Sequence, residues 1–367
     1  MGHLSHAAVL LDVLAQRYTL EAAVTLPRNA RFRDWIERRG YPVEPVGTVI
    51  GGNREFSGID LLRHAASLAA STVSAMHESR RVLERLRPHL VIGTGGRASF
   101  APVLAAALGG YPTITVPHYA LRRSNHLLAR VVDRTCIARE QDLTRFPAYL
   151  RHRLRLTGTP LRPEAFAHAS KTVARERLGL DPVRPVVGLI GYSAGSTATA
   201  RLMADVMRLV RARHPEVQFV VQHGAHPPPG AGGAEGVVAR PFFDDLLSVF
   251  PACEVAVTAA GETTLLELCA RGVASVCISL PDTPIGPHIA VLGRDLEAAG
   301  AAVFLPVERT TVAAVAALVD RLLEHPEERR RMARAGWIAS RPDAVQSVLH
   351  VISELLQERY GSTFATG

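Results

Sequence analysis

Short apolar runs alternate with amphipathic stretches along most of the chain. The apolar runs predict strands at residues 89–93, 113–116, 185–190, 217–222, 254–258 and 275–280. The helical patterns predict helices at residues 7–14, 61–76, 98–108, 170–180, 197–213, 263–271 and 345–358. Because strands that alternate with helices pair in parallel and carry helices on both faces, we expect an α/β fold.

An internal repeat indicates two halves. Residues 91–117 and 255–281 share one plan, in which a strand, a threonine, a small-residue turn, a helix, a glycine, a strand and a proline follow one another. A chain of 367 residues is also long enough for two domains. We therefore expect two similar doubly wound halves, with the boundary near residue 163 after the proline-rich connector 157–163.

Composition narrows the class of protein. Hydrophobic residues make up 47% of the chain and charged residues 21%, which is typical of globular proteins. No apolar stretch approaches the roughly 20 residues that span a bilayer, and no basic-then-apolar signal sequence opens the chain. The four cysteines show no C-x-x-C spacing, so we expect buried, reduced thiols in a cytoplasmic protein.

The formal net charge is +8, and almost all of the positive charge is arginine, since Lys171 is the one lysine. Arginine favours bidentate contacts with phosphates, although a GC-rich genome would enrich arginine equally well. Aromatic residues make up only 5% of the chain. Because single-stranded nucleic acid is bound by stacking on aromatic side chains, nucleic acid is not an expected partner.

One glycine-rich segment, residues 93–98, fits the G-x-G-x-x-A pattern between a strand and a helix. A dinucleotide site of this kind needs an acidic residue about 20 positions further on. No Asp or Glu lies between Glu84 and Asp133, which argues against NAD. A tight turn at Gly95 and Gly96 that presents amides to another ligand is the remaining interpretation.

A second segment, residues 191–195, fits G-x-S-x-G, again between a strand and a helix. The pattern is that of the nucleophile elbow of serine hydrolases, with Ser193 as nucleophile and Asp244 or Asp282 and His288 completing a triad. The usual oxyanion segment has no obvious counterpart upstream. A cradle for a phosphate at the helix N-terminus and a plain structural turn are the alternatives.

The segment 261–267 opens a helix whose first turn holds Thr263 and Thr264. The amides of that turn can bind a phosphate. Glu267 follows one to two turns later, where its carboxylate can accept two hydrogen bonds from the vicinal diol of a ribose. The alternative is an acidic residue that only stabilises the helix dipole.

The start of the chain raises a separate expectation. His3 follows Gly2 at the beginning of a helical run, and a histidine in such a position can act as a general base. A Rossmann-like domain begins with a central strand that feeds its first glycine-rich loop. We therefore expect the natural chain to start about 8–15 residues earlier, with an apolar strand, because strands usually have such lengths.

Together these segments resemble the MurG-type GT-B glycosyltransferases. That family transfers N-acetylglucosamine from UDP-N-acetylglucosamine to the membrane-linked muramoyl-pentapeptide. The resemblance covers nearly the whole chain and rests on the order and spacing of segments 1–3, 93–99, 158–162, 191–195, 243–245, 261–267, 296–301 and 341–344.

The resemblance implies an α/β fold of the GT-B type. Two Rossmann-like doubly wound domains, residues 1–163 and 164–344, would hold the donor site in the cleft between them. The helical segment 345–367 would pack back towards the N-terminal domain, whose first strand is missing from the sequence. A UDP-sugar would be the donor, a hydroxyl group the acceptor, and neither a metal ion nor a cofactor is implied.

The resemblance also assigns residues. Glu267 would hold the ribose hydroxyls, Phe243 would contact the uracil through its backbone, and His3 would serve as the base near the acceptor. The full donor set is Arg162, Ser193, Phe243, Glu262, Thr263, Thr264, Glu267 and His288. The acceptor-side set is Gly95, Gly96, Arg97 and His118.

Two departures from the family pattern keep other functions open. His288, Ile289 and Leu292 stand where the family reads its sugar with two glutamines and an asparagine, and segment 118–124 is short and rich in arginine. A paralogue that glycosylates a natural product or another lipid is thus an alternative to the peptidoglycan enzyme. The further alternatives are a nucleotide-sugar hydrolase, the serine hydrolase, and a non-catalytic nucleotide-sugar-binding protein.

The helix at 61–76 bears on localisation. It has an apolar side and little negative charge, and Arg80 and Arg81 follow it. Such a helix can rest on an anionic membrane, so the protein would be peripheral on the inner face of the cell membrane. The alternative is an ordinary packing helix of a cytoplasmic protein.

Overall fold

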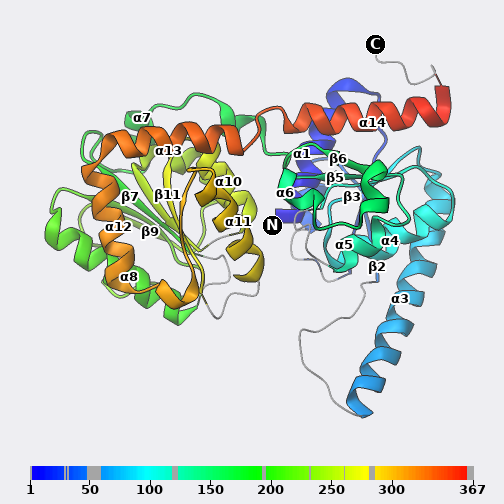
Figure 1. Cartoon of the computed structure of the whole chain (residues 1–367), viewed down its shortest axis with the longest axis horizontal. Helices are drawn as coiled ribbons and strands as arrows, with labels where there is room; N and C mark the ends of the chain where they lie inside the picture. The colour runs from blue at the N-terminus through cyan, green and yellow to red at the C-terminus, as the bar shows by residue number, and fades with distance from the viewer. Residues whose placement is uncertain are drawn as a thin grey trace. The chain divides into compact units, whose positions relative to one another are not determined.

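The computed structural model describes residues 2–28, 30, 33–47, 59–117, 123–191, 196–230, 233–259, 261–280 and 286–361, without the side chains of 2–4, 59–65, 97, 123, 286 and 287. The chain forms two compact units (Figure 1). Unit 1 comprises Met1–Pro160 and Asp343–Gly367, and unit 2 comprises Leu161–Pro342. Each unit is built around parallel strands.

Unit 2 contains a six-stranded sheet with the order β12-β11-β10-β7-β8-β9, and every pair in it is parallel. Its elements are α7 (Lys171–Arg177), β7 (Val186–Ile190), α8 (Thr197–Arg213), β8 (Gln218–Gln222), β9 (Val237–Arg240), α9 (Leu246–Val249), β10 (Val255–Thr258), α10 (Glu262–Ala270), β11 (Ala274–Ile278), α11 (Gly286–Ala298), β12 (Val303–Leu305), α12 (Val312–Glu324) and α13 (Pro326–Ala339). The first strand lies in the middle and the chain runs outward in both directions, which is the Rossmann order.

Both faces of this sheet are covered, because successive side chains of a strand point to opposite faces. In β7, Val187 and Leu189 belong to the cluster that includes residues of α8 and α12. Val186 and Ile190 belong to the cluster on the other face, which includes residues of α10 and α11. All five residues of β7 are buried, as expected of a central parallel strand.

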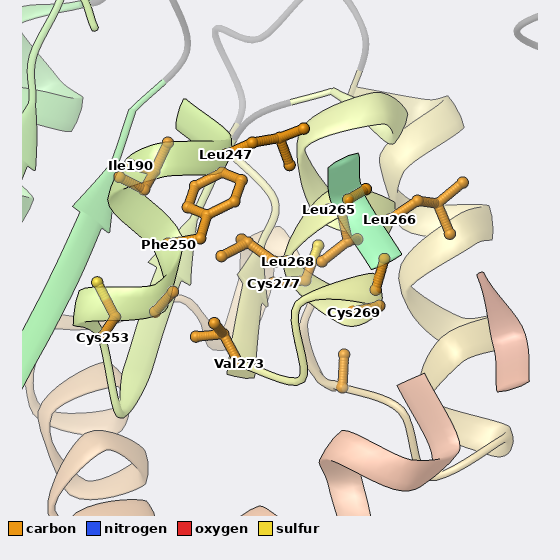
Figure 2. Close-up of a cluster of buried hydrophobic side chains, with 14 of the residues drawn as sticks. Ile190, Leu247, Phe250, Cys253, Leu265, Leu266, Leu268, Cys269, Val273 and Cys277 are labelled. Atoms are coloured by element: carbon orange, nitrogen blue, oxygen red, sulfur yellow. The ribbon is translucent and has the colours of Figure 1, made fainter. Parts of the chain in front are cut away.

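Helix α10 is fixed by its apolar side chains. Figure 2 shows Leu265 and Leu268 of this helix in the same cluster as Leu247 and Phe250, which precede β10. Phe250, Leu265 and Leu268 are fully buried. This packing fixes the position of α10, whose first turn follows the carboxyl end of β10.

Unit 1 contains a four-stranded parallel sheet, β3-β4-β5-β6, and a parallel pair, β1-β2. Its elements are α1 (Gly2–Arg17), β1 (Val24–Pro27), α2 (Arg33–Glu37), β2 (Val43–Val46), α3 (Ile59–Leu86), β3 (Val91–Gly93), α4 (Gly96–Leu108), β4 (Thr113–Thr115), α5 (Arg123–Leu128), β5 (Arg134–Ile137), α6 (Glu140–Leu143), β6 (Leu154–Leu156) and α14 (Ala344–Tyr360). Among the described residues, β1 and β2 pair only with each other. The strand expected before Met1 stays a prediction.

The C-terminal helix α14 is part of unit 1. Its apolar face shares a cluster with α1 and with the strand residues Ile114 and Cys136. At its end, Arg359 donates to Asp133 at 2.5 Å. Burial by itself would raise the pKa of Asp133, but hydrogen bonds from Thr113 and Arg359 outweigh it and hold this pKa below its ordinary value.

The sequence patterns located about half of the strands and helices that the structure describes. The predicted helix 197–213 coincides with α8, and the strands predicted at 185–190 and 254–258 are β7 and β10, each shorter by one residue. The prediction of buried, reduced cysteines is confirmed, because all four are free and buried and burial raises the pKa of each thiol to about 12. No helix in the described part of the chain is long and apolar enough to cross a membrane.

The contact between α11 and β12 yields a stability prediction. A Cβ added at Gly293 would lie 2.3 Å from Cδ2 of the buried ring of Phe304. Glycine inside a helix normally costs about 1 kcal/mol relative to alanine. We nevertheless expect Gly293→Ala to lower the free energy of unfolding by about 1–3 kcal/mol, because overpacking a core outweighs the gain in helix propensity. Urea denaturation measures this.

The matched control is the double variant Gly293→Ala/Phe304→Leu, which removes the clashing ring. Gly293→Ala should lower the free energy of unfolding less when it is added to Phe304→Leu than when it is added to the natural protein. An alanine at 293 that stabilises the otherwise unchanged chain would show that α11 and β12 are not in this close contact.

Candidate functional site

The chain order of the unit 2 sheet reverses between β7 and β10. Ile190 at the end of β7 pairs with Thr258 at the end of β10, so the segments that follow these strands start side by side. In open parallel sheets, ligands bind outside the carboxyl ends of the strands at such a reversal. This reversal therefore marks the expected ligand site of unit 2.

Helices α8 and α10 begin just beyond the reversal, and their first turns differ. The hydroxyl of Ser196 accepts a hydrogen bond from the Thr199 amide at 3.1 Å and caps α8. The N-cap of helix α10 is Gly261, which has no side chain with which to cap the helix. First-turn amides and the positive end of a helix dipole bind anions. Of the two helices, α10 is therefore the better suited to a phosphate group.

The predicted donor residues Glu262, Thr263 and Thr264 form the first turn of α10. Thr263 and Thr264 are partly exposed, as residues that contact a ligand should be. Glu262, in contrast, is only 2% exposed. A carboxylate is favoured by the helix dipole here but would repel a phosphate. Glu262 is thus suited to stabilising the helix start or to accepting hydrogen bonds from uncharged groups.

Glu267 lies further along α10 and is 5% exposed. Burial raises the pKa of its carboxyl, and the charge and hydrogen bond of Arg162 oppose that rise. Nε of Arg162 donates a hydrogen bond to Oε1 of Glu267, at a distance of 3.3 Å. In the part of the chain that the structure describes, Oε2 of Glu267 accepts no hydrogen bond. One carboxylate oxygen is held, and the other is available.

The guanidinium of Arg162 also contacts a second carboxylate. Its Nη1 donates to Oδ1 of Asp245 at 3.1 Å. The same oxygen accepts the Leu247 amide at 3.2 Å, which makes Asp245 the N-cap of α9. The preceding residue, Leu161, is buried in the core and fixes the backbone at Arg162. Two predicted donor residues, Arg162 and Glu267, are therefore brought into direct contact.

Phe243 follows β9, and its ring is buried in the core, with the guanidinium of Arg240 5.3 Å from the ring centroid. Its backbone N–H donates to Oε1 of the buried Gln222 at 3.1 Å. A base that used this N–H would have to replace the Gln222 oxygen. The ring of Phe243 is therefore structural, and only its peptide group can face a ligand.

His288 lies in the first turn of α11, beyond the end of β11, and is partly buried. Ser193 and Asp282 lie outside the described residues, while Asp244 is exposed. The triad of the serine hydrolase hypothesis can therefore not be assembled from the described residues.

The acceptor-side candidates belong to unit 1. Gly95 and Gly96 connect β3 to α4 and have φ angles of 86° and 82°, a left-handed conformation that favours glycine. Arg97 lies in α4 and His3 in the first turn of α1, but both side chains are outside the described part of the structure. His118 is outside it altogether.

Sequence reasoning assigned no role to three residues that lie near Glu267 and Phe243: Gln222, Asp245 and Arg271. Burial lowers the pKa of Arg271, and charges from Asp245 and Glu267 oppose that shift. Asp245 could have been found as an acidic residue directly before a short apolar helix, which is an N-cap signal. The buried Gln222 left no such signal, because it continues the apolar strand β8.

Comparisons with known proteins agree with this arrangement. The model of the glycosyltransferase family 28 C-terminal domain matches residues 186–348, and that of the N-terminal domain matches residues 2–130. A relative from Desulforudis audaxviator (strain MP104C) is 30% identical over 332 residues, which cover 87% of this chain and 86% of the relative. That relative is a UDP-N-acetylglucosamine--N-acetylmuramyl-(pentapeptide) pyrophosphoryl-undecaprenol N-acetylglucosamine transferase.

Solved structures agree on the fold. MurG of Acinetobacter baumannii superposes with a TM-score of 0.70 at 19% identity, covering 96% of both chains. A putative UDP-N-acetylglucosamine 2-epimerase from Listeria monocytogenes also gives 0.70, at 16% identity, covering 97% of this chain and 94% of that one. Because one fold carries both activities, the fold alone does not decide the reaction. The two family models together match most of the chain, which therefore belongs to glycosyltransferase family 28 and is a MurG-like GT-B enzyme that transfers a sugar from a nucleotide-sugar donor.

Proposed function

We propose that this chain is an inverting glycosyltransferase that moves N-acetylglucosamine or a related hexose from a UDP-sugar to a hydroxyl of a lipid-linked acceptor. The observation that carries this proposal is the buried Glu267, which keeps one carboxylate oxygen available beside the uncapped start of α10. The name of the relative from D. audaxviator supports the sugar and the lipid-linked acceptor. The departures at His288, Ile289 and Leu292 favour, as the second candidate, a paralogue that glycosylates another acceptor such as a natural product.

The donor half of the mechanism follows from unit 2. Glu267 would accept hydrogen bonds from the ribose hydroxyls through Oε2. The first-turn amides of Thr263 and Thr264 would bind the diphosphate and stabilise the negative charge that it gains as it leaves. Arg162 would add positive charge close to this group. Phe243 would meet the uracil through its peptide group, and Ser193 would contribute from the turn after β7.

The acceptor half involves unit 1. A base removes the proton of the acceptor hydroxyl, whose oxygen attacks the anomeric carbon from the face opposite the diphosphate. The bond between that carbon and the diphosphate oxygen breaks, UDP leaves with the electron pair, and the configuration inverts. We assign the base to His3, with Gly95, Gly96, Arg97 and His118 on the acceptor side.

Turnover of a panel of UDP-sugars, with UDP release and product mass both measured, tests this function. Glycosylated lipid-linked muramoyl-pentapeptide is the expected product, and turnover with another acceptor alone would identify the paralogue. UDP release without any acceptor would indicate a hydrolase, and binding without turnover a binding protein. Labelling of Ser193 by a fluorophosphonate would support the serine hydrolase instead.

The raised pKa of Glu267 generates a pH prediction. The diol needs an ionised carboxylate as acceptor, so affinity for a UDP-sugar should fall as the pH drops through the pKa of Glu267. Because burial raises this pKa, the fall should begin above the pH at which an ordinary glutamate protonates. Calorimetric titration with a UDP-sugar is suitable, because both phosphates of its diphosphate are esterified and do not take up a proton in the pH interval where Glu267 titrates.

Glu267→Gln is the matched control for this titration. We expect it to weaken binding about tenfold or more, since hydrogen bonds to charged groups contribute about 1.5–3 kcal/mol each. Its affinity should also be independent of pH over the same interval. Affinity within about twofold of the natural protein, well below that contribution, would remove Glu267 from the donor site.

His288 should act on the sugar rather than on the nucleotide. We expect His288→Ala to change the order of preference among UDP-sugars while its affinity for UDP stays nearly constant, because His288 stands where the family pattern reads the sugar rather than the nucleotide. Competition binding with UDP and several UDP-sugars measures both quantities. An equal loss for all of these ligands would contradict the assignment.

We propose that the first half of α3 contacts an anionic membrane. From Ala75 onward the helix has buried positions, but between residues 66 and 74 none is buried, and Val73 is 68% exposed. Figure 1 shows this half extending away from the strands of its own unit. We expect salt-sensitive flotation with anionic vesicles and none with zwitterionic ones.

Charge reversal at Arg80 and Arg81 should abolish that flotation. The control is charge reversal at the exposed Arg208 of α8, which should leave flotation unchanged. Absence of flotation with any vesicle would leave α3 as a packing helix only.

A further inference from the structure

One guanidinium in unit 2 is divided between two carboxylates that differ in exposure. Arg162 donates through Nε to Oε1 of Glu267 and through Nη1 to Oδ1 of Asp245. The Glu267 side chain is 6% exposed, whereas that of Asp245 is 50% exposed. The Asp245 carboxylate is thus largely in contact with water, while Glu267 depends on Arg162 for compensation of its buried charge.

The division limits how Arg162 engages Glu267. A guanidinium that meets a single carboxylate tends to form two parallel hydrogen bonds, one to each oxygen. A pair on the Nε side of the guanidinium would use Nε and Nη2. Here Nε bonds to Oε1 of Glu267 and Nη1 is held by Asp245, and among the described residues Nη2 bonds to neither oxygen of Glu267. The bond to Asp245 thus holds the guanidinium where only one of its N–H groups bonds to Glu267. Asp245 is itself held, because its Oδ1 also accepts the Leu247 amide at the start of α9. The available Oε2 of Glu267 therefore depends on Asp245, which does not touch Glu267 by any hydrogen bond among the described residues.

We propose that Asp245 is a positioning residue for donor binding: it draws the Arg162 guanidinium to one oxygen of Glu267 and so leaves the other oxygen for the ribose diol. This inference rests on the proposed donor site. Without the Asp245 charge, Arg162 turns onto both oxygens of Glu267 and competes with the diol. The donor then binds more weakly, although no group that touches it has been changed.

Asp245→Asn tests the proposal, because asparagine caps a helix as well as aspartate does but lacks the charge that holds Arg162. The Kd and KM of a UDP-sugar should rise about tenfold, the lower end of what hydrogen bonds to a charged group contribute. The kcat at saturating donor should change far less. Asp205→Asn on α8 is the matched control and should leave both constants unchanged, because Asp205 is also 50% exposed and also pairs with an arginine, Arg208.

A double-mutant cycle separates positioning from structure. In a Glu267→Gln background, Asp245→Asn should raise Kd less than about twofold, because the carboxylate on which it acts is gone. Equal effects in both backgrounds would overturn the proposal. Equal melting temperatures of the natural protein and Asp245→Asn would show that the α9 cap is intact, and Asp245→Ser, which also caps, should reproduce the rise in Kd.

A measurement without donor keeps this inference separate from the proposed function. The pKa of Glu267 can be followed by carboxyl-carbon NMR in selectively labelled protein. Loss of the Asp245 charge lowers this pKa by itself, because that charge raises it in the natural protein. A second hydrogen bond from Arg162 should lower it further, so Asp245→Asn should lower the pKa more when Arg162 is present than in an Arg162→Gln background. Equal changes in both backgrounds would overturn the proposal, whereas a larger change with Arg162 present, in a protein that binds no UDP-sugar, would support the positioning and refute the donor site.

Discussion

The six parallel strands of unit 2 must bury both faces, and this constraint arranges the rest of the unit. Covering both faces requires helices to cross over on opposite sides, so the chain runs outward from β7 in two directions. At the reversal between β7 and β10, the following helices leave to opposite faces, α8 into one apolar cluster and α10 into the other. The carboxyl ends of these two strands are therefore not covered by a crossover, and a ligand site becomes available there.

Within that site, the electrostatics follow from burial. The apolar side chains of α10 pack into the core, and the same packing buries Glu267. A buried carboxylate needs a nearby positive charge, and Arg162 supplies it from a segment fixed by the buried Leu161. The result is a charged acceptor that is compensated yet incompletely bonded, which is what a neutral diol requires in order to bind.

In unit 1, helices from both ends of the chain cover the parallel strands. Helix α1 and helix α14 cover the same region of its strands, around Ile114 and Cys136. Ion pairs of Arg134 with Glu358 and of Asp133 with Arg359 reinforce the end of α14. The last helix therefore belongs to the unit that holds the first one, although unit 2 lies between them in sequence.

The sequence by itself determined the fold class and the elements with strong patterns. Helix α8 was predictable because a serine cap precedes a regular amphipathic run, and β7 and β10 because each is short, continuously apolar and bounded by turn residues. Strands β9 and β12 were missed, since an edge strand that is barely buried, or one of only three residues, leaves little pattern. The order of motifs along the chain was sufficient to indicate the family.

The candidate site divides in the same way. Glu267 could be singled out from its place on a helix that opens with a glycine and two threonines, because helical spacing is local information. Its contact with Arg162 could not be predicted, although the resemblance assigned Arg162 to the donor set, because Arg162 is 105 residues from Glu267 and 83 from Asp245 along the chain. Only the packing of Leu161 and α10 into one core brings these groups within hydrogen-bonding distance, and only that distance decides which oxygen of Glu267 remains available.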